Sequence, residues 1–235
     1  EALEKSERRY RGLFESLRDG VVSVSMDGRF VETNSAFQSM VGYSRKELLN
    51  LPHTKTTSRK WHAFEDRIIK NQVLKRGYSD IYEKEYVRKD GTVFSAEVRA
   101  YLERDKDGIP VEMWALARDI SERKKAEKAL KEGELKYRTL FESANDAIFL
   151  MKDNVCIDCN AKTLALFGCT KRQMIGQKPF AFSPQTQPDG SESSGKVAEK
   201  IKAAMNGTFQ FFEWRHCRSD GTPFDVEVSL NSIEL

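Results

Sequence analysis

Residues 2–16 read ALEKSERRYRGLFES and residues 129–143 read ALKEGELKYRTLFES, so two distant parts of the chain carry nearly the same sequence. Ala, Leu, Glu, Tyr, Arg, Leu, Phe, Glu and Ser recur in register, at an offset of 127 residues. The later matching segments are Asp19–Val22 with Asp146–Phe149, Asn34 with Asn160, Val41–Ser44 with Phe167–Thr170, and Arg88–Phe94 with Arg218–Phe224. A repeat this long indicates two copies of a whole domain, because solenoid repeats have periods of ~20–50 residues.

The composition is that of a folded chain with nearly balanced charge. The 235 residues include 39 Lys and Arg against 36 Asp and Glu, a net charge of +3, and 39% are hydrophobic. This balance argues against a nucleic-acid-binding surface. The longest nearly apolar run, Met113–Ala117, is far shorter than the ~20 residues of a membrane-spanning helix. The chain opens on Glu1 in a highly charged stretch without a secretory signal, so we expect a cytoplasmic piece of a longer protein, without membrane contact.

Local patterns in the first copy predict two strands, then helices, then three strands. Asp27-Gly28 is a hairpin signal, Asn34 and the Ser44–Glu47 capping box can begin helices, and apolar residues at 61–75 follow a helical spacing. The expected strands are 21–25, 29–32, Ser79–Arg88, Thr92–Arg104 and Pro110–Ile120. Strands joined by hairpin turns give a five-stranded antiparallel sheet with helices on one face, which is the α+β class.

The second copy repeats this order up to its last strand. Strands are expected near Ala147–Met151, Val155–Asp158, 208–217 and 222–234, and helices after Asn160 and at 194–205. The sequence stops at Leu235, where the fifth strand would follow. We therefore expect the second sheet to lack its last strand in this chain or to receive one from another chain, because an open central edge is a liability.

The ordered set of repeated motifs resembles the PAS family of sensory domains. The residues that carry it are Tyr10–Ser16 and Tyr137–Ser143, Asn34 and Asn160, Gly42–Ser44 and Gly168–Thr170, the Asp-Gly pairs at 90–91 and 220–221, and Arg118–Arg123. The asparagines and glycines are expected to specify the fold rather than contact a ligand, as capping and turn residues generally do. The resemblance implies a signal-input module of a bacterial or archaeal regulator. It divides the chain into an N-terminal amphipathic helix (1–18), a first PAS domain (19–120), a linker helix (121–144) and a second, incomplete PAS domain (145–235).

The segment between the copies contains no proline and predicts one continuous helix. Its small and apolar residues follow a 4-3-4-3 spacing, which is typical of a coiled-coil seam. The seam residues are Ala126, Leu130, Gly133, Tyr137 and Leu140. This spacing favours a parallel homodimer, and a solvated helix packed on its own domain is the alternative. Arg118, Asp119, Ile120 and Ser121 precede the seam, and we expect them to relay a change in the sheet to the helix.

Aromatic and histidine side chains are the candidates for a ligand pocket: Trp61, His62, Trp114, Phe212, Trp214 and His216. Some PAS relatives hold haem through a histidine on a helix, and His62 lies on a predicted helix, although a surface histidine is the alternative. Phe212, Trp214 and His216 share one face of a predicted strand, and they could line a pocket or form an interface. The sequence requires no cofactor, and binding of a haem or of a small organic ligand is left as an open alternative.

The four cysteines, Cys156, Cys159, Cys169 and Cys217, all lie in the second copy. On an extended strand Cys156 and Cys159 point to opposite faces, so one metal ion does not easily reach both. The other two could complete a set with His216 only if the fold brought them together. We therefore predict no metal site and favour buried free thiols in a reducing compartment.

These observations favour a sensory and dimerisation module without enzymatic activity of its own. The chain has three histidines, and no nucleophile, base and orienting group can be assembled. The expected partners are a second copy of this chain and the output domain of a larger signal-transduction protein, a sensor histidine kinase before other types. A receptor for a specific small molecule or haem is the alternative, and a metal site built from the cysteines is less favoured.

Overall fold

Strands β1 (Gly20–Ser25) and β2 (Phe30–Thr33) form the hairpin expected around Asp27-Gly28. Gly28 adopts a φ of +84°, a left-handed conformation that glycine reaches without strain. The structure is a computed structural model and describes residues 2–233. The chain separates into two compact units, which divide between Leu130 and Lys131.

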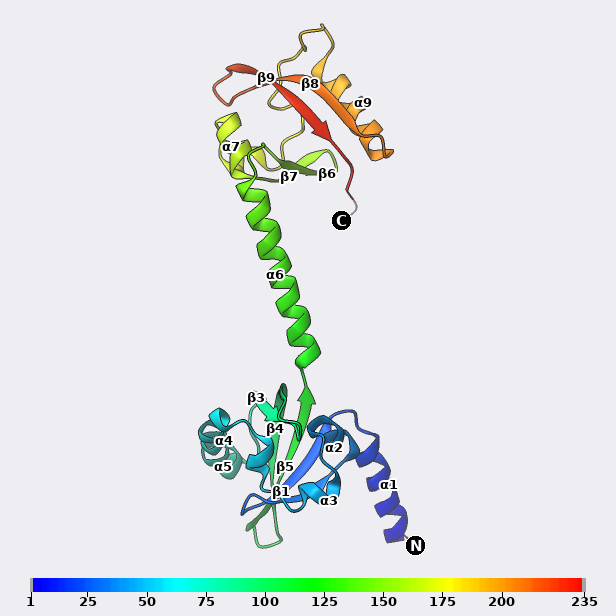
Figure 1. Cartoon of the computed structure of the whole chain (residues 1–235), viewed down its shortest axis with the longest axis vertical. Coiled ribbons are helices and arrows are strands. Elements are labelled where there is room, and N and C mark those ends of the chain that lie inside the picture. Colours follow the sequence, from blue (N-terminus) through cyan, green and yellow to red (C-terminus); the bar gives the residue numbers. More distant parts are fainter. Residues whose placement is uncertain (1, 234–235) are drawn as a thin grey trace. The chain divides into compact units, whose positions relative to one another are not determined.

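The first unit contains the five-stranded antiparallel sheet that the sequence predicts, in the order β2-β1-β5-β4-β3 (Figure 1). Its remaining strands are β3 (Tyr82–Val87), β4 (Val93–Arg104) and β5 (Pro110–Asp119). The last strand in sequence therefore lies between β1 and β4, in the middle of the sheet. A hydrophobic core forms where the inward side chains Val22, Ala96 and Val98 meet Phe37 and Leu48 from the helices.

Helix α1 (Ala2–Ser16) precedes the sheet, and short helices follow β2. They are α2 (Ser35–Val41), α3 (Arg45–Leu48), the 3-10 helices η1 (His53–Thr56) and η2 (Arg59–Trp61), α4 (His62–Ile68), the π-helix η3 (Ile69–Val73) and α5 (Leu74–Arg76). The sequence predicts one helix across 61–75, whereas the structure changes from α to π and back to α within it. In the π segment, Ile69 and Val73 pack against Ala100 and Met113 of the sheet.

The second unit repeats the same elements without a central strand. It contains β6 (Phe149–Lys152), β7 (Val155–Cys159), α7 (Ala161–Phe167), α8 (Lys171–Met174), α9 (Ser193–Met205), β8 (Gln210–Cys217) and β9 (Pro223–Leu230). These strands form two separate two-stranded sheets, β6-β7 and β8-β9. Within the described residues, no strand joins β6 to β9, so the prediction that this domain lacks its last strand is confirmed. Completion by another chain stays a prediction.

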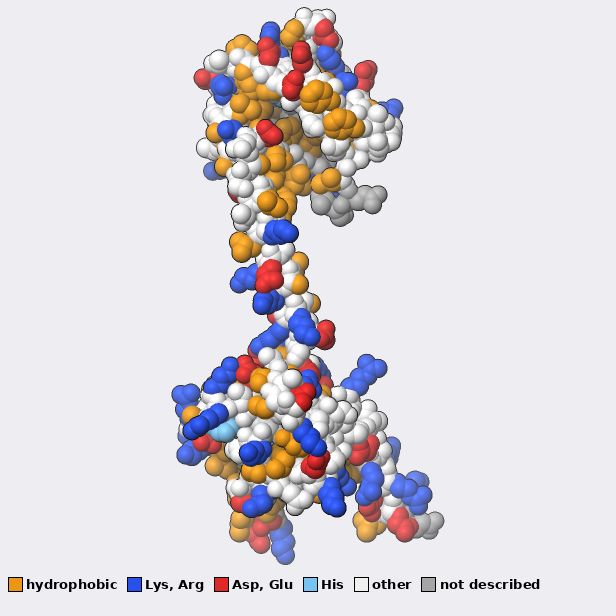
Figure 2. Space-filling view, in the orientation of Figure 1, with side chains coloured by type: hydrophobic (Ala, Val, Ile, Leu, Met, Phe, Trp, Pro, Cys, Tyr) orange, Lys and Arg blue, Asp and Glu red, His pale blue; other side chains and the backbone are white. Residues whose placement is uncertain are grey.

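Helix α6 (Ser121–Ser143) is a single unbroken α-helix across the linker, as the sequence predicts. Figure 2 shows hydrophobic side chains along it, interspersed with charged ones. Among the described residues, none of the helices is both long enough and apolar enough to cross a membrane.

A buried asparagine ties each domain to the helix that precedes it. In the first unit the carboxamide oxygen of Asn34 accepts hydrogen bonds from the backbone N–H groups of Val21 and Phe37, both at 2.9 Å. Its Nδ2 donates to the backbone carbonyls of Phe14, near the end of α1, and Asp19, each at 3.1 Å. One side chain therefore caps α2 and fixes the end of α1 against the sheet.

Asn160 makes the same set of bonds in the second unit. Its oxygen accepts from the N–H groups of Ile148 at 3.1 Å and Thr163 at 3.0 Å. Its Nδ2 donates to the carbonyls of Phe141, near the end of α6, and Asp146 at 3.0 and 2.9 Å. The repeat in sequence thus corresponds to a repeat in hydrogen bonding.

The two cysteines on β7 correct one prediction. Cys156 and Cys159 do not face opposite ways, because both are buried in one cluster with Phe167 and Met174. The pairing of β6 with β7 shifts at a bulge, which places one extra residue, Ile157, between the paired positions. An extra residue reverses the alternation of side chains beyond it.

Candidate functional site

A cavity of about 60 Å³ lies between the helices and the sheet of the first unit. Its walls are mostly apolar, and the apolar part comes from β1, β2, β4, β5, α2 and the π segment. The apolar lining residues are Val22, Val24, Phe30, Phe37, Ile69, Val98, Ala100, Met113 and Ala115. A space of this size accommodates a few water molecules or a small organic molecule, and it is far smaller than the ~300–1,000 Å³ of sites for drug-sized ligands.

One wall of the cavity carries a buried ion pair. Lys84 Nζ on β3 lies 2.7 Å from Glu65 Oε1 on α4, and Lys84 also donates to Thr57 Oγ1 at 3.0 Å. Tyr82 donates its hydroxyl proton to the same Glu65 oxygen at 3.0 Å. The ammonium group of Lys84 lies 4.1 Å from the centre of the Tyr86 ring, a cation–π geometry. All five residues line the cavity.

The ion pair keeps both of its members charged despite their burial. Burial by itself would raise the pKa of Glu65, but the adjacent Lys84 ammonium and the hydroxyl of Tyr82 hold that pKa below its ordinary value. Burial likewise disfavours the charged form of Lys84, yet its pKa is raised because Tyr86 and Glu65 lie beside it. Burial and the carboxylate raise the pKa of Tyr82, so it remains a hydrogen-bond donor.

His53 on η1 is the histidine that lines this cavity. Its Nδ1 lies 2.9 Å from the carbonyl oxygen of Gly28, so Nδ1 carries a proton and donates it. A Cβ at Gly28 would lie 3.0 Å from the same nitrogen. The β1–β2 hairpin therefore needs glycine both for its φ and for the close approach of the histidine ring.

Of the three candidates chosen from sequence in the first copy, only Trp114 is among the residues that border this cavity. Trp61 and His62 are outside the cavity lining, and His62 Nε2 lies 3.1 Å from the carbonyl oxygen of Thr57. Trp114 borders the cavity, but its neighbours on β5 point into the cavity and its own ring points to the opposite face. There it packs edge-on against Phe14 of α1 at 6.2 Å, and its Nε1 donates to Glu103 at 2.7 Å.

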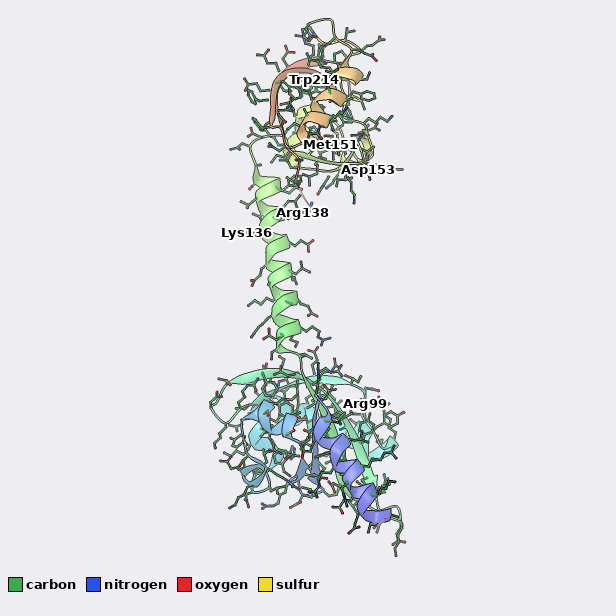
Figure 3. All side chains as sticks on the ribbon, turned by 90° about the vertical axis from the view of Figure 1, so that its right-hand side faces the viewer. Arg99, Lys136, Arg138, Met151, Asp153 and Trp214 are labelled. Atoms are coloured by element: carbon green, nitrogen blue, oxygen red, sulfur yellow. The ribbon has the colours of Figure 1, made fainter. Side chains whose placement is uncertain are left out.

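In the second unit the three aromatic candidates on β8 pack into that domain's own interior. Trp214, labelled in Figure 3, is buried and donates from Nε1 to Ser183 Oγ at 3.0 Å. His216 is also buried; burial lowers its pKa, which a hydrogen bond to the carbonyl of Phe182 partly opposes. Phe212 is half-buried, with its ring 5.7 Å from that of Trp214. His216 borders a small cavity of about 20 Å³, and Trp214 lines a separate, larger hollow of about 560 Å³.

Matching the two copies through Arg88 and Arg218 pairs three inward positions of β3 with three of β8. Tyr82, Lys84 and Tyr86 correspond to Phe212, Trp214 and His216. The match is structural as well, because each arginine donates to a carbonyl near the end of the preceding short helix, Met40 for Arg88 and Leu166 for Arg218. The buried ion pair is therefore particular to the first copy.

The expected relay residues connect β5 to its surroundings at the base of α6. Arg118 forms a two-bond salt bridge with Asp19, at 3.0 and 2.7 Å. Asp119 pairs with Arg88 at 3.1 Å and accepts a hydrogen bond from the backbone N–H of Ser121 at 2.8 Å, which caps the first turn of α6. Ile120 is buried.

The first turn of α6 also contacts two strands of the sheet. Arg123 lies 3.3 Å from Glu83 on β3 and 3.5 Å from Glu97 on β4, and Lys124 lies 2.5 Å from Glu83. Sequence reasoning missed these contacts and the cavity residues Lys84 and Glu65. The position of Lys84 could have been found, since it lies in phase with two inward tyrosines on a strand.

Three of the four cysteines, Cys156, Cys159 and Cys169, lie in surroundings that disfavour the reactive thiolate. Burial, reinforced by the neighbouring Cys159, raises the pKa of the Cys156 thiol to about 11, and burial also raises the pKa of Cys159 and Cys169. These thiols are protonated at neutral pH and are poor nucleophiles and metal ligands. Within residues 2–233, no group of three or more His, Cys, Asp or Glu side chains is arranged to hold a metal ion.

Comparisons with protein families agree with this fold and with the repeat. Residues 8–120 match the family model described as the PAS fold, and residues 145–234 match a second model described as a PAS domain. The chain belongs to the PAS family and contains two of its domains in tandem.

The curated relatives include a sensor, several kinases and a probable diguanylate cyclase. The methyl sulfide methyltransferase-associated sensor of Methanosarcina acetivorans is 34% identical over 131 residues, which cover 55% of this chain and 13% of that protein. Sporulation kinase E of Bacillus subtilis is 28% identical over 174 residues, covering 72% of this chain and 22% of the kinase. Among solved structures, a PAS domain from Colwellia psychrerythraea is 17% identical, with a TM-score of 0.47, over 50% of this chain and 98% of that domain. The chain thus spans less than a quarter of the length of these two curated relatives.

Proposed function

We propose that this chain is the sensory input and dimerisation module of a larger signal-transduction protein, with a sensor histidine kinase as the favoured type. In this proposal the ligand or redox state of a PAS domain changes its sheet, and α6 carries the change onward. We assign the module no enzymatic activity of its own. The kinship with sensor kinases supports the class of protein.

The observation that carries the proposal is the attachment of α6 to the strands that bear the cavity. Glu83, which holds Arg123 and Lys124 of α6, lies on β3 between Tyr82 and Lys84 of the cavity wall. A shift of β3 on ligand binding would therefore move the first turn of the helix. At the other end of α6, Arg138 (Figure 3) pairs with Asp158 of β7 at 3.1 Å, and Asn160 holds the carbonyl of Phe141.

The surface of α6 supports self-association with a second copy. Between its two attached ends, Leu130, Tyr137 and Leu140 are exposed by 75%, 43% and 63%, and the small seam residues Ala126 and Gly133 are exposed as well. Helix α1 repeats this arrangement with exposed Leu3, Tyr10 and Leu13, and exposed Leu17 directly follows the helix. A heptad-spaced stripe of this kind is covered when two parallel helices associate.

Charged substitutions in the stripe are expected to abolish the dimer. Sedimentation equilibrium of residues 1–235 should give a dimer, and the double variant Leu130→Glu/Leu140→Glu should sediment as a monomer because four carboxylates would face each other in the seam. Leu135→Glu is the matched control, since Leu135 lies on the same helix, is 67% exposed and falls outside the stripe. A monomeric wild-type chain, or equal effects of the two variants, would contradict dimerisation through α6.

The register of α6 provides a second test, this time of continuity through the helix. Inserting one alanine after Glu132 turns the downstream half of the stripe by about 100°. We expect this insertion to weaken the dimer at least tenfold, and a seven-residue insertion, which restores the facing direction, to recover most of it. Sedimentation equilibrium measures both. Equal affinities for the two insertions would argue that the helix does not act as one rigid seam.

A further inference from the structure

The buried ion pair of the first unit is not a requirement of the fold. The position of Lys84 is occupied by Trp214 in the second copy, and the neighbouring inward tyrosines are replaced by Phe212 and His216. The second copy builds its β8-β9 hairpin with these three aromatic side chains and without an ion pair between them. A buried ion pair is often no more stabilising than apolar residues of similar volume. The Lys84–Glu65 pair can therefore serve to bind a ligand, because the fold does not need it.

The size of the cavity restricts what it can hold. One water molecule needs about 10–15 Å³ on this measure, and a dry cavity of ~150 Å³ binds benzene. A cavity of about 60 Å³ therefore fits about three to five non-hydrogen atoms. Most of its wall is hydrocarbon, so most of an occupant's surface must be apolar as well.

The charges around the cavity restrict the ligand further. Lys84 and Glu65 neutralise each other at 2.7 Å. A charged ligand would leave one buried charge without compensation, which is strongly unfavourable. A hydroxyl or carbonyl group can instead join the network, because a carboxylate accepts about four hydrogen bonds and the contacts from Lys84 and Tyr82 use two of them.

The helix over the cavity has an unusual form at the same place. Ile69, which lines the cavity, is the first residue of the five-residue π segment. Short π segments within α-helices occur frequently at functional sites. This segment packs on Ala100 and Met113, two further lining residues, so an occupant would contact it directly.

We propose that the cavity of the first domain binds an uncharged, mostly apolar molecule of about three to five non-hydrogen atoms, whose single hydroxyl or carbonyl group bonds to the Lys84–Glu65 pair. Short-chain alcohols and ketones are the chemical class. This inference rests on the proposed sensory function, and it names the kind of signal that the first domain would receive.

Methyl NMR of the 235-residue chain labelled with [¹³C-methyl]-methionine tests it. Met113 lines the cavity, whereas Met174 and Met205 belong to the second unit and serve as internal controls. The probes are 1-propanol, propionate and propylammonium, which share a chain length and differ in charge. We expect 1-propanol to shift the Met113 signal saturably, with the signals of the two controls unchanged, and both ions to bind at least tenfold more weakly. Tighter binding of either ion, or no saturable shift with 1-propanol, would overturn the proposal.

A pair of double variants tests the role of the ion pair. Glu65→Gln/Lys84→Met removes both charges together, and should weaken 1-propanol binding about tenfold. Lys60→Met/Glu85→Gln makes the same exchange at an ion pair with the same 2.7 Å separation but outside the cavity lining, and should leave the affinity unchanged. Equal affinity in both variants would overturn recognition by Lys84 and Glu65. A dimer that forms normally while 1-propanol fails to bind would remove this inference and leave the proposed function intact.

Discussion

Replacing Asn34 by alanine should destabilise the first domain by about 3–5 kcal/mol. The side chain is fully buried and makes four hydrogen bonds to backbone groups of β1, α2, the end of α1 and the segment before β1. Alanine fills none of these roles, and each buried group left without a partner costs about 1–3 kcal/mol. Partial entry of water reduces the total below the simple sum.

The repeat supplies a matched experiment for this prediction. Asn160→Ala should have the same effect confined to the second domain, because its bonds are the same. Hydrogen exchange followed by mass spectrometry resolves the two domains, and each variant should accelerate exchange in its own domain. Asn50→Ala is the control, since exposed Asn50 donates one bond to the Lys46 carbonyl, and its effect should stay within about 0.5 kcal/mol. Loss of protection in both domains from either single variant would argue against two independent copies of this network.

The order of the elements could be predicted from the sequence because turns and caps are local. Asp27-Gly28 and Asp90-Gly91 mark hairpins with glycines at φ of +84° and +85°, and Asn34 and Ser44 cap helices through residues three positions away. Such signals need no knowledge of the distant chain. The internal repeat then placed the same elements in the second domain, including the absence of its central strand.

The π segment and the bulge on β7 could not be predicted from the sequence. A π turn differs from an α-helix by one residue per turn, and the apolar spacing around Ile69 and Val73 suits either form. The bulge at Ile157 depends on how β7 pairs with β6, since nothing in Val155–Cys159 itself demands it. For that reason the prediction that Cys156 and Cys159 point to opposite faces was wrong.

The candidate site was harder to predict because its members come from separate elements. Selection by residue type led to Trp114, which borders the cavity, and to His62, which does not. It missed His53 on η1, whose ring is fixed by the carbonyl of Gly28 in the β1–β2 turn. Lys84 and Glu65 are ordinary surface residue types, and only the packing of α4 on β3 brings them together. The alternation of side chains along β3 predicts that Lys84 points inward, but no local rule predicts that it pairs with Glu65.

Replacing Lys84 alone by methionine should destabilise the first domain by about 3–5 kcal/mol, because Glu65 would then be buried without its ammonium partner. The double variant Glu65→Gln/Lys84→Met removes both charges and should recover most of this loss. Urea unfolding at pH 7 measures the three free energies. If Lys84→Met were as stable as the double variant, Glu65 would take up a proton in the folded domain without a cost in the free energy of unfolding.

The pH dependence of the same comparison gives an independent check with a defined sign. The pKa of Glu65 is lowered by folding, so its contribution is present above the ordinary value of 4.5 and is lost as the pH falls through the lower, folded value. The pKa of Lys84 is raised, so its contribution is present below 10.5 and is lost as the pH rises through the higher, folded value. The stability of the wild-type chain relative to the double variant should therefore be flat from about pH 5 to pH 10 and fall on both sides. A difference that stays constant below pH 4 would mean that the Lys84 ammonium does not stabilise the ionised form of Glu65 in the folded domain.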